Sequence, residues 1–164
     1  MKPDITFIIF RPFFPIDSPV IDLSKDDQFN NIQSTIDRIS AVTKRIIIEY
    51  PLPINKQKFY TPLIIKSIEE GRASSFDDLK IDYSFFWSEV QHIFKRLDSI
   101  KCSNCDRIYT YKLFCDHQVC RVFNPENLYS FLDIGTHYND YAMKCIQQVY
   151  AEIVDDNYAQ GNIE

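Results

Sequence analysis

Four cysteines and a histidine fall within nineteen residues, and their spacing restricts what this chain can form more than any other feature. The segment begins with Cys102-Ser-Asn-Cys105 and ends, nine residues later, with Cys115-Asp-His117-Gln-Val-Cys120. Two close pairs of soft ligands joined by a short loop are typical of a tetrahedral Zn²⁺ site. We therefore predict one structural zinc ion held by Cys102, Cys105, His117 and Cys120.

The fourth ligand is a choice between His117 and Cys115, and the sequence favours His117 because its spacing to Cys120 repeats that of the first pair. Unliganded reduced cysteines and two disulfides are the alternatives. Disulfides are not expected, because the apolar run at residues 5 to 10 is too short for a secretion signal. The expected location is therefore intracellular, in the cytoplasm or the nucleus. A site with four protein ligands is closed, so the predicted zinc is structural rather than catalytic.

The net charge is −5, and an acidic protein does not attract nucleic acid through its overall field. The charge is uneven, however, since residues 92 to 121 carry +3 and the rest of the chain carries −8. Nucleic-acid binding through the metal segment therefore stays the alternative function. No stretch is long enough to span a membrane, so no membrane partner is expected.

Apolar periodicity predicts the secondary structure. The expected strands are residues 5–10, 45–50 and 79–82, with a β-hairpin at 107–114; the expected helices are 25–43 (capped by Ser24), 59–70 (closed by Gly71), 83–97, one beginning at Asn124 and Pro125, and 140–155. These elements predict an α+β fold with a small, mostly antiparallel sheet, about five helices and a zinc-bound β-hairpin insertion.

Three segments of the second half resemble a known family. They are Phe59-Tyr-Thr-Pro-Leu-Ile-Ile-Lys-Ser-Ile-Glu-Glu-Gly71, the strand and helix of residues 79–94, and the closing segment of residues 124–150. Together, residues 59–154 resemble the second half of a BTB/POZ-type domain, the fold shared with Elongin C. The resemblance implies a domain that works by surface contact, with a second copy, a cullin scaffold or a subunit of a larger complex as its partner.

The metal segment would be an insertion in such a domain. It also resembles the start of a RING finger, but Phe123 stands where the next ligand is due and the final cysteine pair is missing. A ribbon-like finger with one zinc is therefore expected. We predict a single domain over residues 1–164, made of a strand–helix–strand part (1–58), a helical BTB/POZ-like part (59–98 and 122–155) and the zinc finger insertion (99–121).

The predicted function is that of an adaptor or protein–protein interaction module without a small-molecule substrate. The hairpin would present aromatic and cationic side chains, which are enriched at interfaces: Tyr109, Tyr111, Lys112 and Phe114. An enzyme is not expected, because the glycine-rich phosphate loop, the Gly-x-Ser-x-Gly elbow and the zinc-deaminase pattern are all missing. His137 precedes Cys145 by eight residues, but a cysteine on an apolar helix face is usually part of a core.

Overall fold

The computed structural model describes residues 2–10, 18–53, 60–71, 80–133 and 137–159. The chain forms two compact units, each assembled from segments that are far apart in the sequence. The first unit comprises Met1–Leu52, Trp87–Thr110 and Glu152–Glu164, and the second comprises Pro53–Phe86 and Tyr111–Ala151.

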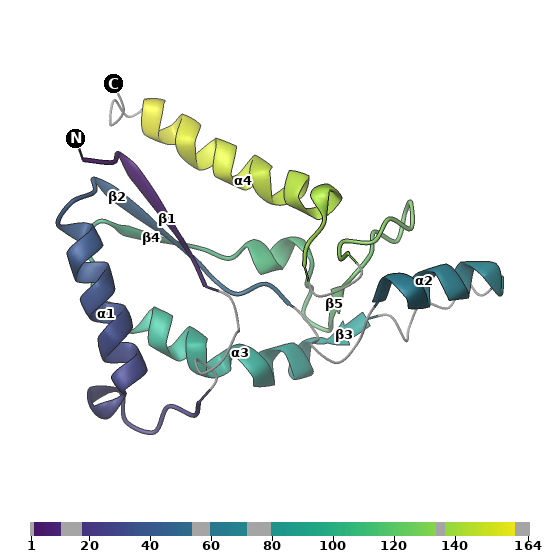
Figure 1. Ribbon diagram of the computed structural model, residues 1–164, viewed down its shortest axis with the longest axis horizontal. Helices are drawn as coiled ribbons and strands as arrows, with labels where there is room; N and C mark the ends of the chain where they lie inside the picture. Colours follow the sequence, from purple (N-terminus) through teal and green to yellow (C-terminus); the bar gives the residue numbers. More distant parts are fainter. Residues whose placement is uncertain (1, 11–17, 54–59, 72–79, 134–136, 160–164) are drawn as a thin grey trace. The chain divides into compact units, whose positions relative to one another are not determined.

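The first unit contains a parallel sheet of three strands in the order β1 (Ile5–Ile9), β2 (Arg45–Glu49) and β4 (Cys105–Ile108), shown side by side in Figure 1. Ile5 pairs with Arg45, and Ile46 pairs with Cys105. The central strand is completely buried at Ile46, Ile47 and Ile48. A run of β-branched residues suits this place, because a central parallel strand is covered on both faces.

Helix α1 (Asp27–Ser40) connects the parallel strands β1 and β2, as a crossover between parallel strands must. It begins at Asp26, whose Oδ1 accepts from the Phe29 N–H at 2.7 Å. The prediction of Ser24 as the cap is wrong, since Ser24 lies in a short 3₁₀ helix, η1 (Leu23–Lys25). Helix α1 also ends before residue 43, where the buried Thr43 hydroxyl bonds the Pro3 carbonyl instead.

Helix α3 (Tyr83–Asp98) confirms the predicted helix at 83–97, and α2 (Tyr60–Glu69) confirms the one at 59–70. Just beyond the end of α3, Arg107 Nη2 donates to the Ile100 carbonyl at 2.9 Å. Helix α2 is followed by Gly71 at φ +67, the left-handed conformation that glycine adopts without strain.

The second unit contains an antiparallel pair, β3 (Lys80–Asp82) and β5 (Val119–Arg121), and a short 3₁₀ helix, η3 (Thr110–Leu113), leads into it. Phe114 lies between Phe131 and Tyr138, with ring centroids 4.9 Å apart in each case. Helix α4 (Asp140–Ala159) begins in this unit and confirms the last predicted helix.

Three further predictions about the fold are wrong, although the α+β class is confirmed. The sheet of the first unit is parallel, not antiparallel. Residues 107–114 form no hairpin, because β4 pairs with β2 and then continues into η3. The chain after Asn124 is a closed turn and not a helix: Asn124 Oδ1 accepts from the Glu126 N–H, and Leu128 has a φ of 61. Within the described segments, no helix combines the length and apolar character needed to cross a membrane.

Candidate active site

The chain reverses direction between Leu132 and Tyr138 in the second unit, and this turn brings an aspartate and a histidine together. Leu132 and Tyr138 form an isolated antiparallel bridge. Next to this bridge, the Asp133 N–H donates to the His137 carbonyl at 2.9 Å. The backbone therefore places Asp133 directly opposite His137.

Asn139 secures this turn at its base. Its Nδ2 donates to the Ser130 carbonyl at 2.7 Å, and its backbone N–H donates to the Phe131 carbonyl at 3.0 Å. Its Oδ1 accepts from the Ala142 N–H at 3.1 Å, as an N-cap residue does at the start of a helix. One side chain thus fixes both the turn and the beginning of α4.

The Asp133 carboxylate contacts His137 twice. Its Oδ2 lies 3.6 Å from His137 Nδ1, and its Oδ1 accepts from the His137 backbone N–H at 3.3 Å. The side chains of His137 and Asp133 are 65% and 47% exposed. The imidazole is therefore both oriented by a carboxylate and accessible to a substrate.

A carboxylate beside Nδ1 holds a histidine in the tautomer whose Nε2 can accept a proton. Such an imidazole can act as a general base toward a hydroxyl or a water, and afterwards as a general acid toward the leaving group. Among the residues that the structure describes, Asp133 is the side-chain partner of the His137 ring, and no hydroxyl or thiol bonds to its Nε2.

Aromatic side chains pack next to Asp133 and His137. Phe131 stacks on Tyr141, with centroids 5.7 Å apart and planes 4° from parallel. The Tyr141 hydroxyl accepts from the Asn124 and Asn127 amides at 2.7 and 3.1 Å. Tyr138 donates to the Pro53 carbonyl at 2.7 Å, and burial raises the pKa of Tyr138 well above its ordinary value. This packing restricts the movement of Phe131 and Tyr138, which are close to Asp133 and His137 in the sequence, and a catalytic pair needs a rigid frame.

Polar side chains also follow the carboxyl ends of the parallel strands in the first unit, a common place for ligand sites. There the Thr110 hydroxyl donates to Glu49, and both residues are 2% exposed. The Tyr50 hydroxyl donates to Asp98, and burial, followed by this carboxylate, raises the pKa of Tyr50. Glu49, Tyr50 and Thr110 are buried, and each is bonded to a neighbouring side chain, so they stabilise the unit rather than offer a site.

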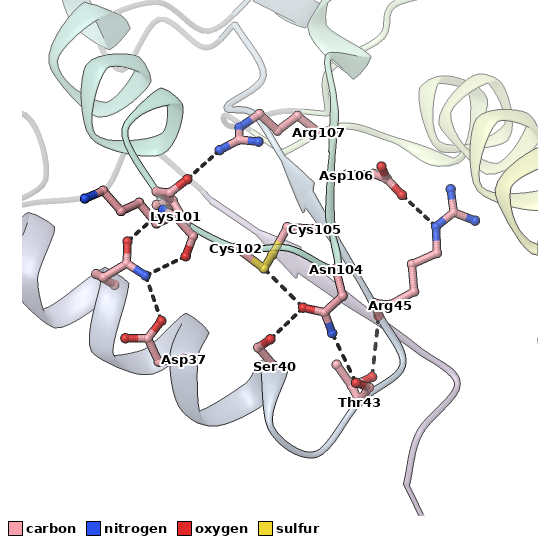
Figure 2. The surroundings of a disulfide bond; sticks show 12 residues. Asp37, Ser40, Thr43, Arg45, Lys101, Cys102, Asn104, Cys105, Asp106 and Arg107 are labelled. Atoms are coloured by element: carbon pink, nitrogen blue, oxygen red, sulfur yellow. Dashed lines mark hydrogen bonds and ion pairs between the residues drawn. A yellow bond between two sulfur atoms is a disulfide. The ribbon is translucent and has the colours of Figure 1, made fainter.

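The predicted metal ligands form two disulfides, Cys102–Cys105 in the first unit and Cys115–Cys120 in the second. Figure 2 shows the first of them. His117 is exposed in the loop that the second disulfide closes. No group of three or more His, Cys, Asp or Glu side chains in the described part of the chain could hold a metal ion. The predicted zinc finger is therefore wrong, while uptake of Zn²⁺ by a reduced form of the chain stays a prediction.

The four side chains predicted to contact a partner are not all on the surface. Tyr109 and Lys112 are exposed, but Tyr111 and Phe114 are 7% and 2% exposed. The Tyr111 ring packs on Phe86, with centroids 5.4 Å apart. Two of the four side chains thus contribute to the interior of the second unit.

The sequence prediction considered His137 beside Cys145 and did not connect it with Asp133. In the structure, Cys145 Sγ contacts the Tyr141 carbonyl within α4 at 3.7 Å. The available signal was an aspartate four residues before the histidine, at a point where the helical pattern breaks. A turn of this length can fold back and bring the two side chains together.

One family model matches almost the whole chain. It describes an SGNH domain (fused to AT3 domains) and covers residues 6–152, which are 147 of the 164 residues. Members of this family are typically hydrolases, namely esterases and lipases. No curated protein and no solved structure matches the chain.

This match overturns the BTB/POZ resemblance, because it includes nearly all of the segment on which the resemblance was based. The predicted adaptor function and its nucleic-acid alternative lose their basis with it, and the expectation that the chain is not an enzyme is wrong for a family of hydrolases. The chain belongs to the family of SGNH domains that occur fused to AT3 domains.

Proposed function

We propose that this chain is an ester hydrolase in which His137 is the general base and Asp133 orients it. The observation that carries the proposal is the contact of 3.6 Å between His137 Nδ1 and Asp133 Oδ2, two side chains that are accessible to solvent. Family membership supports the same class of reaction.

The two side chains have separate roles in this proposal. His137 Nε2 takes a proton from the attacking water and gives it to the departing alcohol, so that water and an ester give an acid and an alcohol. Asp133 keeps the imidazole in the reactive tautomer and stabilises the imidazolium that forms. The separation of 3.6 Å is longer than a good hydrogen bond, and catalytic contacts often shorten when substrate binds.

The experiment compares the hydrolysis of a p-nitrophenyl ester by the wild type, His137→Gln and Asp133→Asn. Loss of a positioned general base lowers such rates by roughly 10²–10⁴-fold, and we expect His137→Gln to fall in that range. Asp133→Asn should lower kcat by roughly 10²-fold or more, because an amide favours the wrong tautomer.

His117→Gln is the matched control. His117 is also an exposed histidine of the second unit, but it lies in the disulfide-closed loop, and its replacement should leave the rate unchanged. Equal rates for His117→Gln and His137→Gln, with both variants folded by circular dichroism, would contradict the proposal.

A further inference from the structure

The disulfide between Cys102 and Cys105 encloses only two residues and lies between the end of α3 and the first residue of β4. Both cysteines are half-buried, so a small molecule can approach from solvent. Figure 2 shows the bond beside α1, with the polar side chains of Ser40, Thr43 and Asn104 near it.

The loop that carries this disulfide is held in place without it. Gln33 makes two hydrogen bonds to the backbone of Lys101, both of 2.9 Å. Asn104 Nδ2 donates to the carbonyls of Thr43 and Lys44 at 3.2 and 3.3 Å, and the Asn104 carbonyl accepts from the Ile46 N–H at 2.8 Å. Breaking the sulfur–sulfur bond leaves all of these contacts intact.

A partner for a free thiol is already present. Asn104 Oδ1, which accepts from the Ser40 hydroxyl at 2.5 Å, lies 3.3 Å from Cys102 Sγ (Figure 2). A disulfide sulfur has no proton to donate, but a Cys102 thiol has one, and the amide oxygen has a second lone pair to accept it. The site therefore suits both the oxidised and the reduced state.

The second disulfide has a different environment. Cys120 is 0% exposed and sits in the middle of β5, where it pairs with Ile81 of β3. A thiol can reach only Cys115 of that bond without opening the sheet, and its attack would expel Cys120 as a thiolate inside the buried strand. Since burial disfavours a thiolate and exchange depends on the leaving thiolate, the two disulfides should differ in reactivity.

We propose that Cys102–Cys105 is a thiol–disulfide exchange site whose reaction partner is a small thiol, and that Cys115–Cys120 is a structural disulfide. A thiolate of the reductant attacks Cys105 Sγ, and Cys102 leaves as a thiolate, which takes a proton and donates to Asn104. A second thiol of the reductant then attacks the mixed disulfide. Two reductant thiols are oxidised to one disulfide, and the two electrons and two protons give the thiols of Cys102 and Cys105.

The test follows the reduction of each disulfide in the oxidised chain. Cys145, the free cysteine, is first blocked with iodoacetamide. Reduced glutathione is added, the new thiols are alkylated with a second reagent at successive times, and mass spectrometry of the peptides counts them. We expect Cys102 and Cys105 to be reduced about tenfold faster than Cys115 and Cys120, because access and thiolate character control exchange.

Two double variants separate exchange from folding. Cys102→Ser/Cys105→Ser should keep the circular dichroism spectrum of the wild type, whereas Cys115→Ser/Cys120→Ser should lower the midpoint of thermal unfolding. Equal reduction rates for the two pairs, loss of the fold on reduction of Cys102–Cys105, or immediate alkylation of Cys102 and Cys105 in the oxidised chain would each overturn the proposal.

Discussion

At the scale of single residues, Asp26 combines two roles in the first unit. It caps α1 through the Phe29 N–H and forms an ion pair of 2.8 Å with Arg96, whose side chain is 1% exposed. Removing one partner of a buried ion pair costs about 3–5 kcal/mol. We therefore expect Asp26→Ala to lower the free energy of unfolding in urea by about that amount.

Lys25→Met is the control for this change. Lys25 forms an ion pair with Asp22 at 3.9 Å, but its side chain is 85% exposed. Exposed pairs of this kind contribute at most about 1 kcal/mol. Similar losses in the two variants would show that burial does not set the strength of the Arg96 pair.

The same carboxylate gives the protein a dependence on pH. The hydrogen bond from Arg96 is the main cause that holds the pKa of Asp26 below its ordinary value of 3.8. The stability from Asp26 is therefore complete above the unfolded-state value and is lost as the pH falls through the lower native value. The difference in unfolding free energy between wild type and Asp26→Asn should shrink below about pH 4, and a constant difference from pH 6 to pH 3 would contradict this.

The residue types alone indicated which segments carry reactive side chains, but not what those side chains do. Cys-x2-Cys is compatible with a zinc ligand pair and with a disulfide, and only the surroundings of Cys102 and Cys105 distinguish the two. Asp133 and His137 were visible as residue types. Their contact depends on a reversal of the chain, which spacing by itself does not determine.

At the scale of elements, the turn that carries His137 depends on Asn139. Asn139→Ala removes the N-cap of α4, which costs about 1 kcal/mol, and also the bond to the Ser130 carbonyl. Because small displacements of a catalytic group cost up to about 10²-fold in rate, we expect kcat for ester hydrolysis to fall roughly tenfold or more in the folded variant.

Asn139→Asp separates these two effects. Its carboxylate keeps the acceptor for the Ala142 N–H but lacks the donor to the Ser130 carbonyl. Thermal stability should return nearly to that of the wild type while kcat stays low. Recovery of both quantities would show that Asn139 acts through helix stability and does not position His137.

The predicted elements succeeded where one local rule decides the structure. Residues Ile46, Ile47 and Ile48 form an apolar, β-branched run, and they form the central strand. The prediction of a hairpin failed because strand pairing cannot be read from the sequence. The composition of β4 would suit an edge strand in any sheet, and only the tertiary structure makes β2 its partner. The helix predicted after Asn124 is absent because an asparagine side chain can stabilise a turn as well as cap a helix.

At the scale of the whole molecule, the two units should unfold together. Helix α3 continues across the boundary between Phe86 and Trp87, and α4 continues across the boundary between Ala151 and Glu152. If one unit unfolded alone, α3 and α4 would each lose backbone hydrogen bonds in their interior. The part of α3 left in the folded unit would be too short to stay helical in water. Cooperative unfolding of both units is the expected result.

Each unit has its own probe for this prediction. Trp87, the one tryptophan of the sequence, reports on the first unit by fluorescence, and Cys145 reports on the second by its reactivity toward a thiol reagent. In guanidinium chloride, the two signals should change at the same midpoint, as they do in a two-state transition. A midpoint for Cys145 at clearly lower denaturant would mean that the turn holding Asp133 and His137 lies in a unit that opens independently, and the helices that cross the boundary would then not couple the two units.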